Sequence, residues 1–139
     1  MMRRSTKVGL LVCGALVASG LGTANAQERR PYPYTDGKDI YEHICAGCHM
    51  PDAKGAVGAG AYPALAANPR LETGLYPVMI ILRGLKSMPP FAELDDDQVA
   101  AVANYVRTSY GNKFADPVTA EQVKALRPTV VRRRTGRAG

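Results

Sequence analysis

The sequence has few residues that bind free metal ions and no pattern that predicts a sheet. Its 139 residues include only two histidines and three cysteines. No segment alternates apolar and polar side chains convincingly, and no internal repeat is visible. Apolar residues at helical spacing, by contrast, recur along the chain. The sequence therefore predicts an all-α fold.

Basic residues are scarce in the middle of the chain. The formal net charge is +6, but residues 1–26 carry three basic groups and no acidic one, so the remainder is near +3. Much of that remainder lies at Arg29 and Arg30 and in an arginine-rich C-terminus. A nucleic-acid-binding domain shows basic residues over its folded surface, interleaved with aromatic residues. We therefore expect no nucleic-acid partner. The basic end is interpreted as a solubilising tail, with docking to an acidic protein or a peripheral membrane contact as the alternative.

The N-terminus has the composition of an export signal. A basic start, an apolar run and a small-residue motif follow one another, formed by Arg3, Arg4 and Lys7, by residues 8–21, and by Ala24-Asn25-Ala26. This order is typical of a signal peptide. We expect residues 1–26 to be cleaved off and the protein to be located in the periplasm. The alternatives are a retained membrane anchor, for which the run is short, and lipid attachment at Cys13, which follows Val12 rather than a small residue.

The rest of the chain divides into three parts. Residues 27–35 contain two prolines and two tyrosines and predict an extended lead-in. Residues 36–112 predict the helical domain. Residues 113–139 predict a C-terminal extension with a short helix and a basic disordered tail.

Four helices are predicted from caps and apolar spacing. They run from about Gly37 to Cys45 after a cap at Asp36 or Thr35, from Tyr76-Pro77 to Gly84, from the capping box Asp95/Gln98 to Gly111, and from the capping box Thr119/Gln122 to about Arg127. Residues 51–68 are rich in Gly, Ala and Pro and predict a loop. The side chains expected inside are Ile40, Tyr41, Ile44, Val78, Met79, Leu82, Val99, Val102, Ala103 and Val106.

The pentapeptide Cys45-Ala46-Gly47-Cys48-His49 carries the chemistry. Two thiols three residues apart at a helix end can reach both vinyl groups of a haem, and His49 then supplies an axial imidazole. Zinc and thiol-redox sites also use C-x-x-C. A zinc site needs two more ligands, and His43 is the only other histidine; a thioredoxin-like site belongs to a βαβ pattern, which the sequence lacks. The motif therefore predicts one haem c, attached through Cys45 and Cys48.

The iron then needs a second ligand or has an open face. His43 lies on the helix of the attachment cysteines, and Met50 adjoins His49, so neither can reach the opposite side. Met79 falls on an apolar helix face, where methionine usually fills the core. Met88 follows the Gly84 loop and precedes two prolines that stiffen the segment. We predict Met88 as the sixth ligand; the alternative is a buried loop methionine.

The order of helix, Cys-x-x-Cys-His, Gly/Pro loop, Met-Pro and terminal amphipathic helix resembles class I cytochrome c over about residues 36–112. The resemblance implies that the first helix crosses the last, through Gly37, Ile40 and Tyr41 on one side and Val102, Tyr105 and Val106 on the other. It also implies that the carbonyl of Pro63 accepts a hydrogen bond from the proximal imidazole of His49, which fixes the ring and makes it more basic.

Three segments resemble the cytochrome subunits of periplasmic alcohol, sugar and aldehyde dehydrogenases: Tyr62-Pro63-Ala64-Leu65, Met88-Pro89-Pro90-Phe91 and Asn104-Tyr105-Val106-Arg107. Those subunits often carry several haems, whereas this chain has one attachment motif. The resemblance implies a dehydrogenase as electron donor and a cytochrome or an oxidase as acceptor.

With His49 and Met88 as ligands, we expect an electron-transfer protein rather than an enzyme. An apolar pocket of Ile44, Leu65, Val78, Met79, Leu82 and Phe91 is expected around the haem. Arg83 is a candidate partner for a haem propionate, with a solvated arginine as the alternative. Two other classes of protein stay open: a haem enzyme or ligand sensor with an open sixth position, and a structural zinc or disulfide module.

Overall fold

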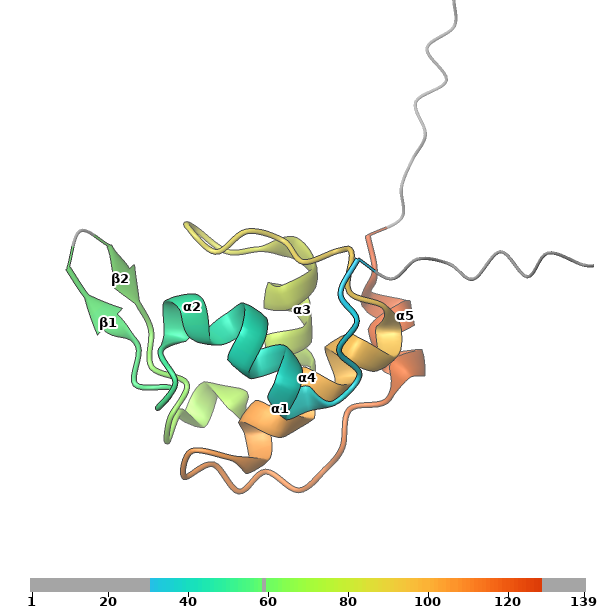
Figure 1. Cartoon of the computed structure of the whole chain (residues 1–139). Helices are drawn as coiled ribbons and strands as arrows, with labels where there is room; N and C mark the ends of the chain where they lie inside the picture. Colours follow the sequence, from blue (N-terminus) through green and yellow to red (C-terminus); the bar gives the residue numbers. More distant parts are fainter. Residues whose placement is uncertain (1–30, 59, 129–139) are drawn as a thin grey trace, which may run out of the picture.

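Helices account for most of the fold, and one small hairpin projects beside them (Figure 1). The structure is a computed structural model that describes residues 31–58 and 60–128. The predicted signal peptide, Cys13, the start of the lead-in and residues 129–139 of the tail lie outside the described residues. The elements are α1 (Gly37–Ile40), a π-helical segment (Tyr41–Cys45), α2 (Ala46–His49), β1 (Ala56–Val57), β2 (Ala61–Tyr62), a 3-10 turn (Pro69–Leu71), α3 (Leu75–Arg83), α4 (Asp96–Thr108) and α5 (Ala120–Leu126).

The first helical stretch is continuous from Gly37 to His49, four residues longer than predicted. Asp36 caps it: its Oδ1 accepts from the amides of Lys38 at 2.8 Å and Asp39 at 3.3 Å. The predicted end at Cys45 is wrong because the backbone stays helical through the haem motif. The stretch stops only at Met50, whose φ of 65° breaks the helical path.

The crossing of α1 over α4 is confirmed. A Cβ on Gly37 would lie 2.2 Å from the carbonyl oxygen of Ala101, so only glycine permits this approach. Beside it, the rings of Tyr41 and Tyr105 lie 5.8 Å apart between centroids. The crossing therefore fixes the helical stretch that carries the cysteines against α4.

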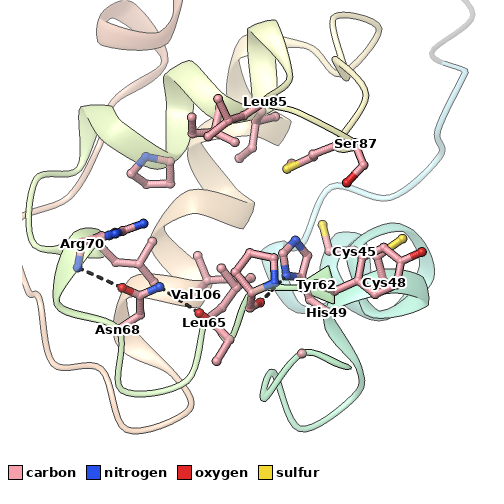
Figure 2. Close-up of a pocket in the computed structure, with 18 of the residues that line it drawn as sticks. Cys45, Cys48, His49, Tyr62, Leu65, Asn68, Arg70, Leu85, Ser87 and Val106 are labelled. Atoms are coloured by element: carbon pink, nitrogen blue, oxygen red, sulfur yellow. Dashed lines mark hydrogen bonds between the residues drawn. The ribbon is translucent and has the colours of Figure 1, made fainter. Parts of the chain in front are cut away.

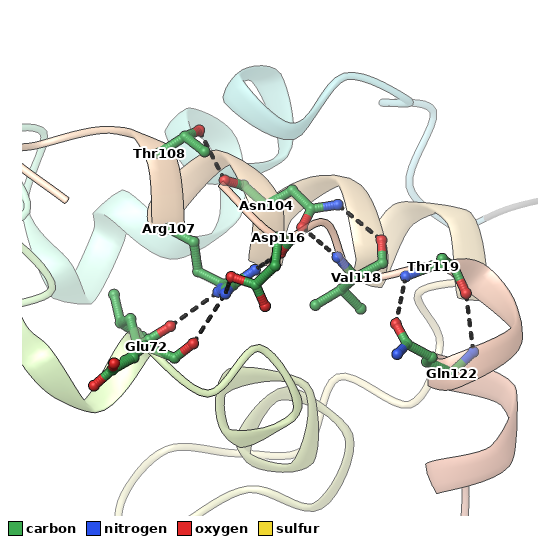
Figure 3. Close-up of polar contacts among 9 residues, drawn as sticks. Glu72, Asn104, Arg107, Thr108, Asp116, Val118, Thr119 and Gln122 are labelled. Carbon is green, nitrogen blue, oxygen red and sulfur yellow. Dashed lines mark hydrogen bonds and ion pairs between the residues drawn. The ribbon is translucent and has the colours of Figure 1, made fainter. Parts of the chain in front are cut away.

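Both predicted capping boxes are present. In α4 the Asp95 carboxylate accepts from the Gln98 amide at 2.9 Å, and the Gln98 side chain accepts from the Asp95 amide at 3.0 Å. Thr119 and Gln122 repeat this arrangement at α5 (Figure 3). The predicted inner face of α4 is confirmed, since Val99, Val102, Ala103 and Val106 are buried.

Helix α5 packs against α3 and α4. Val118 and Val123, on either side of its cap, are both buried in the common core. The segment before α5 is held to α4 by Asn104, whose side chain bonds both the amide and the carbonyl of Val118 (Figure 3). The described part of the extension, up to residue 128, thus covers one side of the helical domain.

The loop prediction for residues 51–68 misses a short antiparallel hairpin. Ala56 pairs with Tyr62 and Val57 with Ala61. Each strand has only two residues, too few to show alternation in the sequence. The chain that follows is held to the turn after the first helical stretch, because the amides of Leu65 and Ala66 both donate to the carbonyl of Ala53. Within the described part of the chain, no helix is long and apolar enough to cross a membrane.

Candidate functional site

A cavity of about 730 Å³ opens between α2, the hairpin, the 3-10 turn, α3 and the loop after α3 (Figure 2). This volume is within the range of sites for small molecules and cofactors. Most of the side chains that line the cavity are apolar, and the others include two thiols, one imidazole and three basic groups. The lining includes Ile44, Cys45, Cys48, His49, Lys54, Pro63, Leu65, Arg70, Pro77, Ile80, Ile81, Lys86, Met88 and Phe91.

The three reactive groups of the pentapeptide lie together on one side of this cavity (Figure 2). Neither cysteine forms a disulfide, and Cys45 is half-buried while Cys48 is exposed. Burial, with a smaller effect of Cys48, raises the pKa of the Cys45 thiol to about 12. The Cys45 sulfur is therefore a protonated thiol at neutral pH rather than a thiolate nucleophile.

The imidazole of His49 is buried and oriented. Its Nδ1 lies 3.0 Å from the carbonyl oxygen of Pro63, so the hydrogen bond that the resemblance implies is present. A carbonyl can only accept, so Nδ1 carries the proton and Nε2 keeps its lone pair. His49 lines the cavity, and this tautomer makes Nε2 available as a metal ligand.

Met88 lines the same cavity from the loop after α3. Backbone hydrogen bonds in both directions between Leu85 and Met88, each 3.0 Å, close the loop into a tight turn. Gly84 enters it at φ 71°, and a Cβ there would lie 2.6 Å from the carbonyl oxygen of Met88. The structure thus brings Cys45, Cys48, His49, Pro63 and Met88 to one cavity.

The other candidates lie elsewhere. His43 is exposed and stacks on Tyr34, with ring centroids 4.3 Å apart. Neither His43 nor Met50 lines the cavity, in agreement with the argument against them. Met79 is half-buried and borders a separate hollow beside Tyr76.

The predicted apolar wall is partly wrong. Ile44, Leu65 and Phe91 line the cavity, but Val78, Met79 and Leu82 do not. Val78 and Leu82 are buried in the core on the other side of α3. The cavity is lined instead by Pro77, Ile80 and Ile81. Because α3 is apolar on both sides, helical spacing alone could not distinguish its core face from its cavity face.

Sequence reasoning also missed the charged residues of the wall. Arg83, the candidate for pairing with a propionate, is exposed and does not line the cavity. Lys54, Arg70 and Lys86 line it, and no acidic side chain does among the described residues. Arg70 is on the 3-10 turn, which starts at Pro69 after the Asn68 cap. The Asn-Pro pair signals a turn in the sequence, but nothing local indicates where the next side chain points.

The residues present fit a haem. Two thiols and an imidazole with a free Nε2 lie on one side of an apolar cavity whose lining also includes a thioether, and every charged group in the lining is cationic. Cations suit the two carboxylates of a haem, and a thioether and an imidazole are ligands of haem iron.

Comparison with known proteins agrees with this chemistry. A family model described as "Cytochrome C oxidase, cbb3-type, subunit III" matches residues 33–106. Cytochrome c-552 of Thermus thermophilus is 35% identical over 81% of this chain and 82% of its own length. The 4-cresol dehydrogenase [hydroxylating] cytochrome c subunit of Pseudomonas putida is 31% identical over 70% of this chain and 80% of its own length.

The fructose dehydrogenase cytochrome subunit of Gluconobacter japonicus is 37% identical over 78% of this chain, but the match covers only 26% of that longer subunit. The family model spans more than half of this chain, and the match to cytochrome c-552 covers most of both proteins. The fold is mostly helical, as the resemblance implied, and adds one two-stranded sheet that the sequence did not predict. The chain belongs to the cytochrome c family.

Proposed function

We propose that this protein is a periplasmic cytochrome that holds one haem c and passes single electrons, accepting them from a dehydrogenase. The observation that carries the proposal is the shared cavity: two cysteines and His49 in it come from one helical stretch, and Met88 comes from a loop about forty residues later. A single Cys-x-x-Cys-His motif supports one haem. The composition of residues 1–26 supports export.

In this proposal each residue of the cavity has a defined task. The thiols of Cys45 and Cys48 would hold the group covalently, and Nε2 of His49 and the sulfur of Met88 would bind its iron. When bound, haem supplies an Fe(III)/Fe(II) couple. The Pro63 carbonyl keeps Nδ1 protonated and makes the imidazole a stronger donor. The thioether of Met88 favours the reduced state, and the apolar walls exclude water. With His49 and Met88 both holding the iron, no substrate would reach the metal, so the protein would act as a carrier or subunit and not as an enzyme.

A dehydrogenase as partner is supported by the relatives. The names of the Gluconobacter and Pseudomonas proteins describe cytochrome subunits of fructose and 4-cresol dehydrogenases. We expect this protein to accept electrons from such a dehydrogenase deprived of its own cytochrome subunit. Reduction would be followed by absorption after rapid mixing. A lack of reduction by either enzyme would contradict this class of partner.

The sixth ligand is tested by Met88→Ala, with Met79→Ala as the matched control outside the cavity. After expression with a cytochrome c maturation system, the wild type should carry one haem per chain and, when reduced, should not bind carbon monoxide. Met88→Ala should bind it readily, and its reduction potential should fall by roughly 0.1 V or more, a fraction of the ~0.8 V that axial ligands span. Met79→Ala should behave as the wild type does.

Two outcomes would favour the other classes of protein. Rapid carbon monoxide binding by the reduced wild type would indicate an open sixth position, as in a haem enzyme or a ligand sensor. Expression without any haem absorption, despite the maturation system, would indicate a structural zinc or disulfide module.

A further inference from the structure

The carbonyl that orients His49 lies on a segment without a helix or strand of its own. Pro63 follows β2 and is exposed, and the next regular element begins only at Pro69. A chain in this situation moves unless other groups hold it. The 3.0 Å hydrogen bond from His49 therefore depends on what anchors the segment on either side of Pro63.

Gly55 anchors the segment from one side. Its amide donates to the carbonyl of His49 at 3.0 Å, and its φ is 68°. A Cβ on Gly55 would lie 2.1 Å from the Tyr62 carbonyl oxygen and 2.9 Å from that of Pro63. The backbone of Gly55 therefore lies between the backbone of His49 and the Pro63 carbonyl, so close to that carbonyl that no residue with a side chain fits at this position.

Asn112 anchors the segment from the other side, across 44 residues of chain. Asn112 is buried, with 5% of the residue exposed. Its Oδ1 accepts from the Asn68 amide at 2.9 Å, and its Nδ2 donates to the carbonyls of Leu65 at 2.8 Å and Val106 at 2.7 Å. Both amide hydrogens and the amide oxygen are thus used, and the three bonds join the segment to the last turns of α4.

Asn68 extends this network toward the proline. Its Nδ2 donates to the carbonyl of Ala64 at 2.8 Å, and its Oδ1 accepts from the amide of Arg70 at 3.0 Å (Figure 2). Ala64 directly follows Pro63. A continuous set of hydrogen bonds therefore leads from α4 through Asn112 and Asn68 to the Ala64 carbonyl, one peptide unit beyond the Pro63 carbonyl that faces the imidazole.

We propose that Asn112 is a positioning residue for the proximal imidazole: it holds the Pro63 carbonyl within hydrogen-bond distance of His49 and so tunes the haem. The inference rests on the proposed function, because it takes His49 as the iron ligand. If the carbonyl moves away, Nδ1–H loses its acceptor and the imidazole becomes a weaker donor. A weaker donor stabilises Fe(III) less, so the reduction potential rises.

The test compares Asn112→Ala with Asn104→Ala. Asn104 is the matched control because its side-chain amide also bonds backbone through both its oxygen and its nitrogen, to the Val118 amide at 2.8 Å and the Val118 carbonyl at 2.9 Å. Unlike Asn112, it has no hydrogen bond to the described residues of the segment that carries Pro63. Both variants should be less stable than the wild type. Only Asn112→Ala should show a raised reduction potential. Its His49 Nδ1 proton should also exchange faster with solvent than in the wild type, by roughly fivefold or more, as expected from losing one buried hydrogen bond.

The readouts are potentiometric titration and proton NMR of the reduced holoprotein. If Asn112→Ala does not accumulate as folded protein, Asn68→Ala, which removes the bond to Ala64, takes its place with the same expectation. Equal potentials and equal exchange rates in the variant and the wild type would overturn the inference and leave the proposed function intact. Equal shifts in the Asn104→Ala control would also overturn it, since the effect would then follow stability alone. A wild type without haem would overturn both proposals.

Discussion

Tyr41 combines packing with a specific polar contact beside the haem motif. Its side chain is fully buried, and its hydroxyl donates to the carbonyl of Met50 at 2.8 Å. That carbonyl belongs to the residue whose positive φ ends the helical stretch after His49. The centroid of the Tyr41 ring lies 5.1 Å from that of Tyr110 and 5.8 Å from that of Tyr105. Tyr41 therefore holds the end of the helix that presents the imidazole.

Because Tyr41 is buried, the free energy of unfolding should fall at alkaline pH. Burial, followed by smaller effects of Cys45 and Tyr105, raises the pKa of Tyr41 from 10.0 to about 12. Because the folded state binds the phenolic proton more tightly than the unfolded state, the protonated hydroxyl of Tyr41 adds to the free energy of unfolding. This contribution is complete below pH 10 and is lost as the pH rises toward 12. We expect Tyr41→Phe to cost about 1 kcal/mol at neutral pH through the lost hydrogen bond.

Above pH 10 the free energy of unfolding of Tyr41→Phe should fall less steeply than that of the wild type. Urea unfolding at several pH values measures both slopes. Burial also raises the pKa of Tyr110, so some decline remains in the variant. Equal slopes in the two proteins would contradict the assignment to Tyr41.

Among the elements, α4 is joined to its neighbours by one buried charge. Arg107 is completely buried, and its guanidinium donates to the carbonyls of Leu71 at 2.9 Å, Glu72 at 3.0 Å and Asp116, whose carboxylate it also meets at 2.7 Å (Figure 3). A planar group with five N–H donors can serve several carbonyls at once, which an ammonium cannot do in this geometry. The 3-10 turn, the segment before α5 and α4 thus share one side chain.

The two partners of this ion pair should differ in their effect on stability. Arg107→Met keeps much of the volume but leaves buried carbonyls without a donor, and we expect it to cost about 3 kcal/mol. Asp116 is 77% exposed at its side chain, so Asp116→Asn should cost much less. Urea unfolding at pH 7 measures both. A larger loss for Asp116→Asn than for Arg107→Met would show that the charge pair, not the carbonyl contacts, holds these elements together.

Helix starts could be predicted because their signals are local. Each capping box spans four consecutive residues, as at Asp95–Gln98, so sequence alone identifies it. The hairpin could not be predicted, since its two-residue strands show no alternation and are joined by only two residue pairs, Ala56 with Tyr62 and Val57 with Ala61. The continuation of helix past Cys45 was missed because the motif was assigned to a helix end, whereas the backbone unwinds only after His49.

At the site, too, the residues with local sequence signals could be predicted and those placed by contacts across the fold could not. Cys45, Cys48 and His49 form one contiguous motif, and Met88 was marked by the glycine and prolines around it. Arg70 lines the cavity, and Asn112 holds the segment that carries Pro63 through its bond to Leu65. Both placements depend on contacts across the fold, which no local sequence pattern encodes. The fold thus determines which polar residues support the motif, and these are the residues that sequence reasoning missed.

On the scale of the whole molecule, the local charge around the cavity differs from the net charge. The described residues carry nine basic and eleven acidic side chains, so this part of the chain is near −2. Yet the charged residues that line the cavity are Lys54, Arg70 and Lys86. Lys54 forms an ion pair with Asp52 at 3.4 Å, and Arg70 and Lys86 form none with the acidic residues that the structure describes. A redox partner that approaches the cavity therefore meets a positive field on a mildly acidic body.

This field can be measured with an anionic oxidant, ferricyanide, and the pair Lys86→Gln and Lys124→Gln. Both variants remove one exposed lysine charge, but Lys124 is on α5, which Figure 1 shows on the opposite side of the molecule from the hairpin. At about 0.1 M salt, charges act over only about 10 Å. There we expect Lys86→Gln to slow oxidation of the reduced protein roughly twofold, and Lys124→Gln to leave it unchanged. At about 0.01 M salt the screening length is near 30 Å, so both variants should be slower. Equal slowing of the two at the higher salt would mean that net charge, not the lysine beside the cavity, governs the encounter.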